Sequence, residues 1–237
     1  YLIQESYYKL IKDRIVYSYE NKDQIKQKNE RIINENDYIE LKPIGNGSFF
    51  IIYLIYHIKD EQLYVIKKNN NSDEKEMEKL KKREIDNYKN IIHPLFPKFI
   101  GTTKKDEYLV LEYINGKTFS EIDFSEFSLI EKYSIIYQIL YIFKYLHENK
   151  YIYRDLKPNN IMLSIDQKVV LIDFDRMIKE NLQINESHDD FTKDFHSDFN
   201  APEINSKHLT DKCDIYSIGK IIEYIIEDKN CEDSKIN

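Results

Sequence analysis

Apolar residues in the first half of the chain fall into short runs that are rich in β-branched and aromatic side chains. Short polar turns separate these runs, a pattern that predicts β-strands. The predicted strands are residues 38–44, 48–58, 62–68, 98–102 and 108–113. Between the third and fourth runs lies a charged stretch with helical spacing, for which Ser72 or Asp73 is the expected N-cap. This half is therefore expected to form a small sheet with one helix.

Apolar residues in the second half recur mostly at helical spacing. This spacing predicts a long helix at residues 128–149 and another at 212–227. Between them, the short apolar segments 160–163 and 169–172 predict two strands. A small sheet with one helix, followed by a mostly helical half, predicts an α+β fold with two lobes.

Residues 1–37 are polar and contain neither glycine nor proline. Isoleucines at helical spacing predict one or two amphipathic helices in this segment. These isoleucines are Ile11, Ile15, Ile25, Ile32 and Ile33. We interpret residues 1–37 as a helical, polar extension and expect the folded domain at 38–237, with lobes at about 38–114 and 115–237.

The 237 residues (28.7 kDa) are 41% hydrophobic and 32% charged, which is ordinary for a soluble protein. The net charge of -7 argues against nucleic acid or an anionic membrane as a partner. The longest apolar run, residues 49–56, is too short to cross a bilayer. Cys213 and Cys231 have no metal-binding spacing, so a reducing, cytoplasmic setting is expected.

Two glycines and a later pair of charged residues are the candidates for chemistry in the first half. Gly45 and Gly47, taken alone, indicate only a hairpin turn, because glycine tolerates a positive φ. Lys67 ends the third predicted strand, and Glu84 lies on the charged helix. These two side chains could pair and hold an ammonium group where phosphates arrive.

The second half contains the more specific pattern, YRDLKPNN followed by LIDFD. Asp155 precedes a short strand and can accept the proton of an attacking hydroxyl. Asn160 and Asp173 offer oxygen ligands that suit Mg²⁺ bridging nucleotide phosphates. Lys157 can neutralise charge on a transferring phosphoryl group.

From about Tyr38 onward, these motifs in this order resemble the eukaryotic-type protein kinase family. The resemblance implies a two-lobed kinase fold, ATP and Mg²⁺ as cofactors, and transfer of the γ-phosphoryl group to a protein. Lys157 after RDL resembles the Ser/Thr type, so the expected acceptors are Ser and Thr hydroxyls. A small-molecule phosphotransferase is disfavoured by that lysine and by APE at residues 201–203.

The resemblance also implies roles for single residues. Asp155 resembles the catalytic base and Lys157 its partner, while Lys67 and Glu84 match the ion pair of the first lobe. The nucleotide-binding residues would be Gly45, Gly47, Ile52, Val65, Lys67, Glu112, Ile114 and Met162. The metal ligands would be Asn160 and Asp173. Supporting roles would fall to Leu111 as gatekeeper, to Tyr88, Tyr153 and Phe174 as a stacked spine, to Asp214 beneath the catalytic loop and to Glu203 in the activation segment.

Three positions depart from the family pattern. Phe50 replaces the third glycine of the phosphate loop, Asp175 replaces the glycine of DFG, and His196 stands where a threonine is usual. These departures favour the alternative of a pseudokinase that acts as a nucleotide-binding or scaffold module. The intact Lys67 and Asp155 oppose it, and an active kinase is our leading hypothesis.

Two further expectations concern regulation and extent. Thr192 lies 203 − 192 = 11 residues before Glu203 and could be phosphorylated, by the chain itself or by an upstream kinase, and then pair with Arg154. Histidines among the aspartates of this segment indicate an acidic loop rather than a metal cluster. Because kinases usually have further helices in the second lobe, we expect this chain to be a fragment.

Overall fold

The computed structural model describes residues 31–47, 50–69, 74–105, 108–180, 197–204 and 209–227. These residues form two compact units. Unit 1 contains the described residues up to Asn115 together with Asp173–Asp175, and unit 2 contains Gly116–Ile172 and the described residues from Arg176 onward. The expected α+β class is confirmed, because unit 1 is built mainly of strands and unit 2 carries two long helices.

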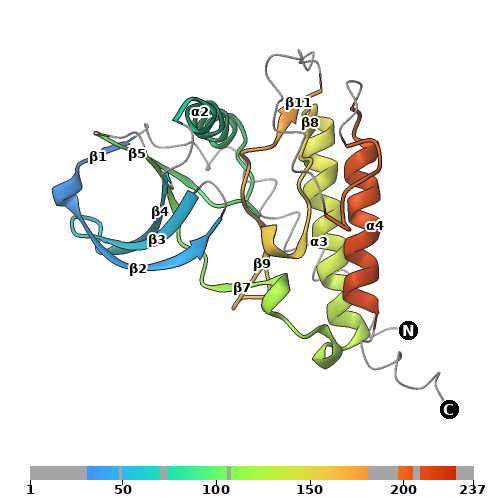
Figure 1. Ribbon diagram of the computed structural model, residues 1–237. Coiled ribbons are helices and arrows are strands. Elements are labelled where there is room, and N and C mark those ends of the chain that lie inside the picture. Colours follow the sequence, from blue (N-terminus) through green and yellow to red (C-terminus); the bar gives the residue numbers. More distant parts are fainter. Residues whose placement is uncertain are drawn as a thin grey trace. The chain divides into compact units, whose positions relative to one another are not determined.

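Unit 1 is a six-stranded curved sheet in the order β1-β5-β6-β4-β3-β2, with helix α2 (Glu74–Asn90) beside it (Figure 1). Its strands are β1 (Arg31–Ile33), β2 (Tyr38–Asn46), β3 (Phe50–His57), β4 (Gln62–Asn69), β5 (Phe99–Thr103) and β6 (Leu109–Glu112). All five predicted strands of this half are present, and the predicted helix lies between the expected strands. Neighbouring strands are antiparallel except for β1 and β5.

Strand β1 corrects the prediction that Ile32 and Ile33 belong to a helix. It pairs in parallel with β5, and Ile33 is buried in a core with Ile55, Ile66 and Val110. Ile32 points outward and is 67% exposed. Arg31 is exposed as well, so the strand follows from pairing with β5 and from burial of Ile33, and these contacts with distant residues override the helical spacing. The predicted helices at Ile11, Ile15 and Ile25 lie outside the described residues.

Gly101 in β5 allows β1 to approach closely. Its φ is +156°, and a β-carbon at this position would lie 1.9 Å from the carbonyl oxygen of Arg31. Any other residue would therefore collide with the β1 backbone. The single turn η2 (Glu35–Asp37) then leads from β1 into β2.

Unit 2 contains helices α3 (Leu129–Glu148) and α4 (Lys212–Ile226), which lie side by side and run in opposite directions (Figure 1). A three-stranded sheet has the order β10-β9-β7, and a second ladder joins β11 to β8. These strands are β7 (Gly116–Thr118), β8 (Tyr151–Ile152), β9 (Ile161–Ser164), β10 (Val169–Leu171) and β11 (Ile178–Lys179). Single turns η3 (Phe119–Glu121), η4 (Phe124–Glu126) and η5 (Pro158–Asn160) complete the described part of the unit.

Helix α3 begins where the sequence predicts, after Ser128. The Ser128 amide donates to the Glu131 carboxylate at 2.8 Å, and the two residues form a capping box. This pairing satisfies backbone donors that the first turn of a helix leaves open. Within the described residues, no helix combines the length and the apolar character that a bilayer span would need.

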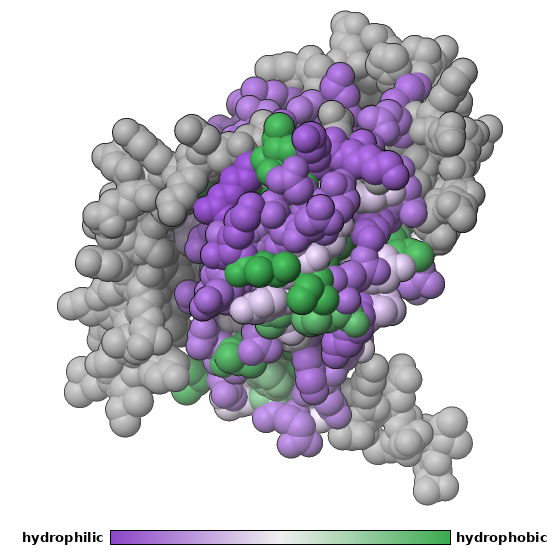
Figure 2. Space-filling view, turned by 90° about the vertical axis from the view of Figure 1, so that its left-hand side faces the viewer, coloured by the Kyte–Doolittle hydropathy of each residue, from purple (hydrophilic) through white to green (hydrophobic). Residues whose placement is uncertain are grey.

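Where Figure 2 colours the surface, it is largely hydrophilic, and apolar side chains lie among the polar ones. Among the described residues of unit 1, exposed apolar side chains include Ile32, Ile39, Leu41, Ile58 and Leu63. Scattered apolar side chains are normal on soluble proteins.

Candidate active site

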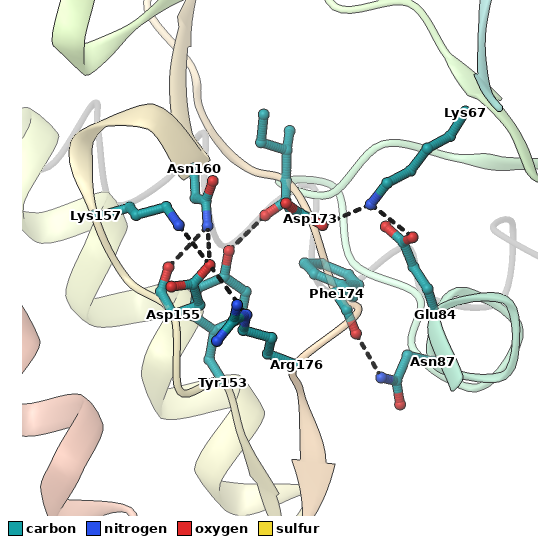
Figure 3. A network of polar contacts seen from close by, with 11 residues as sticks. Lys67, Glu84, Asn87, Tyr153, Asp155, Lys157, Asn160, Asp173, Phe174 and Arg176 are labelled. Atoms are coloured by element: carbon teal, nitrogen blue, oxygen red, sulfur yellow. Dashed lines mark hydrogen bonds and ion pairs between the residues drawn. The ribbon is translucent and has the colours of Figure 1, made fainter. Parts of the chain in front are cut away.

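Lys67 is the centre of a polar cluster in unit 1 (Figure 3). Strand β4 carries it opposite helix α2, and its ammonium lies 2.7 Å from a carboxylate oxygen of Glu84. The same ammonium lies 2.7 Å from Asp173 Oδ1. The structure therefore brings together three residues that are separated by 17 and by 106 positions in the sequence.

The charges of this cluster do not balance. Burial alone lowers the pKa of Lys67, but the carboxylates of Asp173, Glu84 and Asp175 raise it well above its ordinary value. Burial also raises the pKa of Glu84, although the Lys67 charge opposes this effect. One ammonium thus faces three acidic side chains. Because Asp173 remains 34% exposed, a divalent cation could reach this excess of negative charge.

Helix α2 also holds the short segment that contains Asp173. The ring of Phe174 stacks on Tyr88 with 4.4 Å between centroids and 17° between planes. The Asn87 side-chain amide donates to the Phe174 carbonyl at 2.7 Å. Asp173 itself has a φ of 65°, which is uncommon for a residue other than glycine and is a form of strain found at functional sites.

The stacked spine that the resemblance implies is present in part. Tyr88 and Phe174 stack within unit 1, as described above. Tyr153 belongs to unit 2, where its ring packs edge-on against Phe143 at 5.9 Å and its hydroxyl donates to the Ile172 carbonyl. Stacking of Tyr153 on Phe174 stays a prediction.

The apolar residues expected around adenine share one face of the unit 1 sheet. Ile52 lies opposite Lys67 in the β3–β4 ladder, and Val65 lies opposite Leu111 in the β4–β6 ladder. Val65 and Lys67 are two positions apart on β4 and therefore point to the same side. Ile52 and Val65 are both half-buried, which leaves part of each side chain accessible.

The two glycines of the predicted phosphate loop do not adopt the positive φ that glycine tolerates. Neither Gly45 nor Gly47 has a positive φ. A β-carbon on Gly45 would lie 3.3 Å from Ile52, so a side chain there would be tightly packed. The Gly47 amide donates to the Phe50 carbonyl at 2.8 Å, whereas residues 48 and 49 lie outside the described residues.

Phe50 has a contact that sequence reasoning missed. Its side chain is buried, and the Lys67 ammonium lies 4.6 Å from the centroid of its ring. This distance is within the range of a cation–π interaction. The residue in place of the third glycine is therefore part of the Lys67 cluster.

Glu112 and Ile114 lie two positions apart, just before the chain enters unit 2. The backbone of Glu112 is fixed, because its amide donates to the Lys98 carbonyl at 2.9 Å and its carboxylate accepts from the Lys98 amide at 3.1 Å. The Ile114 amide has no hydrogen-bond partner among the described residues.

Asp155 is the centre of the polar cluster in unit 2 (Figure 3). The Lys157 ammonium donates to Asp155 Oδ2 at 2.8 Å, and the Asn160 side-chain amide donates to the same oxygen at 2.9 Å. The Asn160 side-chain amide also donates to the backbone carbonyl of Asp155. The backbone carbonyl of Asn160 accepts from the Ile172 amide. These bonds hold the η5 turn against the loop of the candidate base.

Asp214 on helix α4 stabilises the loop that contains Asp155 through hydrogen bonds to its backbone. Its buried carboxylate accepts hydrogen bonds from the backbone amides of Tyr153 and Arg154, each at 2.9 Å. Arg154 has a φ of 75°, and the two bonds help to stabilise this unusual backbone. His147 Nε2 lies 2.9 Å from the same carboxylate, and no motif or spacing in the sequence indicates this partner.

The remaining predicted site residues have no polar contacts with the two clusters, or lie outside the described residues. Met162 is half-buried on β9 and lies opposite Val170 and Thr118. Glu203 is exposed and forms no ion pair with any described residue. Thr192, His196 and the acidic stretch around them lie outside the described residues. In the part of the chain that the structure describes, no three His, Cys, Asp or Glu residues group as a metal site.

Comparisons with known proteins identify the family. Residues 38–235 match the model of the protein kinase domain. The serine/threonine-protein kinase SULU of Caenorhabditis elegans is 32% identical over 195 residues, which cover 78% of this chain and 19% of that protein. Sgk1 of Gallus gallus is 32% identical over 196 residues, which cover 79% of this chain and 44% of the relative.

A third relative, the probable serine/threonine-protein kinase MARK-C of Dictyostelium discoideum, is 30% identical over 212 residues, covering 85% of this chain and 27% of its own length. The chain thus spans less than half the length of each of these relatives. The family model covers well over half of the chain, and the clusters around Lys67 and Asp155 carry the motifs of this family. The chain belongs to the eukaryotic-type Ser/Thr protein kinase family.

Proposed function

We propose that this chain is an active protein kinase that transfers the γ-phosphoryl group of ATP to Ser or Thr hydroxyls of proteins. The observation that carries the proposal is the Lys67 ammonium, which lies 2.7 Å from both Glu84 and Asp173. Catalysis of phosphoryl transfer depends mainly on positioning and on electrostatic stabilisation. A buried lysine fixed by two carboxylates from different elements supplies both.

The residues of unit 1 would bind the nucleotide. Lys67 would contact its phosphates, Ile52 and Val65 would pack against the adenine, and the backbone groups of Glu112 and Ile114 would hydrogen-bond its edge. The Ile114 amide, which has no hydrogen-bond partner among the described residues, supports this assignment. The family resemblance implies the same role for Gly45 and Gly47, and for Met162 of unit 2.

The residues of unit 2 would serve the acceptor. Asp155 would accept the proton of the Ser or Thr hydroxyl, and Lys157 would offset charge on the transferring group. The family resemblance implies two Mg²⁺ ligands, Asn160 of unit 2 and Asp173 of unit 1, and amide and carboxylate oxygens are ligands that this ion prefers. Bound Mg²⁺ would neutralise charge on the phosphates.

Protein substrates, a cytoplasmic location and regulation at Thr192 are further parts of the proposal. Lys157 and the three relatives named as serine/threonine kinases support Ser and Thr as acceptors. Phosphate on Thr192, from this chain or from an upstream kinase, would pair with Arg154. The chain's cysteine pattern and net charge of -7 support a cytoplasmic protein that binds neither nucleic acid nor membranes.

The test is an autophosphorylation assay with ATP and Mg²⁺, followed by mass spectrometry to locate the modified residues. Transfer by the full chain, and its loss in Asp155→Asn, would support the active kinase. Nucleotide binding without any transfer would instead support the pseudokinase, in which the chain acts as a scaffold.

A further inference from the structure

The ladder between β8 and β11 determines what lies beside the candidate base. Ile152 is opposite Ile178 in this antiparallel pair. Asp155 follows Ile152 by three positions (155 − 152), and Arg176 precedes Ile178 by two (178 − 176). Because antiparallel strands run in opposite directions, both segments extend from the same end of the ladder. The backbone pairing therefore brings Arg176 next to the Asp155 loop.

The Arg176 side chain uses this placement to reach the base. Its Nε lies 4.0 Å from Asp155 Oδ2, the oxygen that also accepts from Lys157 and Asn160 (Figure 3). The Arg176 side chain is 17% exposed and that of Asp155 is 7% exposed. At this burial, water and salt screen the attraction less than they would on the surface.

Arg176 also occupies a special place in the chain. It is the first residue that returns to unit 2 after the three residues Asp173–Asp175, which belong to unit 1. The residue after it, Met177, is fully buried, so the backbone beside Arg176 is fixed by packing. The guanidinium is thus supplied by a well-anchored segment of unit 2.

We propose that Arg176 is a positioning residue for the Asp155 carboxylate. Together with Lys157, its guanidinium holds Oδ2 and restricts rotation of the carboxylate, which keeps Asp155 oriented toward the acceptor hydroxyl. A base held in one orientation reacts faster, because less of the barrier is spent on ordering the reacting groups. This inference rests on the proposed kinase function.

The experiment compares the steady-state kinetics of full-length variants, with ATP–Mg²⁺ as donor and an acceptor peptide taken from the mapped autophosphorylation site. Arg176→Leu removes the guanidinium, and Arg176→Lys keeps the positive charge. Lys179→Leu is the matched control, because it removes the same charge from β11 at an exposed position, where the ammonium lies 5.6 Å from the Tyr151 ring.

We expect Arg176→Leu to lower kcat about tenfold, the size of a modest charged contact, while the KM for ATP changes less than about twofold. Arg176→Lys should recover most of the loss, and Lys179→Leu should match the wild type. Thermal unfolding of each variant verifies that the protein is folded, and Arg176→Gln replaces Arg176→Leu if the latter does not fold.

Two results would overturn the inference while leaving the kinase function in place. One is a wild-type kcat in Arg176→Leu, and the other is an equal loss in Lys179→Leu, which would indicate a general charge effect. Absence of transfer by the wild-type chain would overturn the proposed function and this inference together.

Discussion

Lys67 and Asp155 are each surrounded by an excess of opposite charge. The Lys67 ammonium faces several carboxylates in unit 1, so this cluster as a whole is negative. The Asp155 carboxylate has Lys157 at 2.8 Å and Arg176 at 4.0 Å, so its surroundings are positive. A negative cluster favours a divalent cation, and a positive one favours the anionic group in transfer. The two residue environments therefore suit different parts of the phosphoryl transfer that we propose.

Asp155→Asn should lower the rate of phosphoryl transfer by about 10²- to 10⁴-fold, the usual contribution of a general base. Asparagine keeps the shape of the side chain but cannot accept the hydroxyl proton in the same way. Binding of ATP–Mg²⁺, measured by calorimetry, should change little, because the carboxylate acts on the acceptor. Asp166→Asn, at an exposed turn position, is the control that should retain wild-type transfer.

Phe50→Ala should lower the free energy of unfolding by about 3 kcal/mol, as expected when a buried aromatic ring is removed. The loss would show that the residue in place of a loop glycine has a structural role in the Lys67 cluster. Leu63→Ala, at a 40% exposed position of the same sheet, should have a much smaller effect. Denaturant titration measures both, and equal losses would contradict the role assigned to Phe50.

At the scale of elements, strand β1 is the least expected part of the fold. It depends on Gly101, because a β-carbon there would overlap the carbonyl of Arg31, and on Ile33 in the core. The β1 segment also contacts the turns of unit 1, since the Lys104 amide donates to the Ile33 carbonyl at 3.0 Å. Residues upstream of the matched kinase domain are thus part of the unit 1 sheet.

Gly101→Ala should destabilise the protein by about 1–3 kcal/mol, because alanine is strained at this φ and its β-carbon meets the β1 backbone. Amide hydrogen exchange should become faster in β1 than in β3. Gly219→Ala is the matched substitution in α4, where a β-carbon would meet nothing within 4 Å. It should stabilise the helix by up to about 1 kcal/mol. Equal effects of the two substitutions would argue against a β1 dependence on Gly101.

The elements that the sequence predicted well are those with a local signal. The strands at Phe50–His57 and Gln62–Asn69 have runs of β-branched and aromatic residues, and Leu129–Glu148 begins at a serine cap. The strands β1, β8 and β11 have only two or three residues each. Such short strands exist because distant partners pair with them, and no periodicity within two residues can indicate that.

At the scale of the whole molecule, the motifs predicted the candidate site residues. They did not predict all of the side chains that contact these residues. Lys67 and Glu84 could be paired from a strand followed by a helix. His147 could not be linked to Asp214, because the two lie 67 positions apart with no shared pattern. The same holds for Arg176, whose place beside the base comes from the β8–β11 register.

Binding of the nucleotide with its metal should stabilise the whole protein. At a ligand concentration of about 100 times Kd, the expected gain in the free energy of unfolding is about 2.7 kcal/mol. Thermal unfolding with ATP–Mg²⁺ should therefore occur at a higher temperature than with ATP and EDTA. In Asp173→Ala the metal-dependent part of this increase should vanish, since a metal ligand is lost. A metal-dependent increase as large as that of the wild type would contradict the assignment of Asp173.

The brief return of the chain to unit 1 at Asp173–Asp175 has a consequence for dissecting the protein. A gene fragment that stops at Asn115 would encode every strand of the six-stranded sheet but not the three residues that complete the unit. Lys67 would then lose the carboxylates of Asp173 and Asp175 and keep that of Glu84, and the Tyr88 ring would lose the Phe174 ring that stacks on it. The shortest continuous fragment with an intact unit 1 therefore extends through Asp175, and the two units cannot be separated by a single cut.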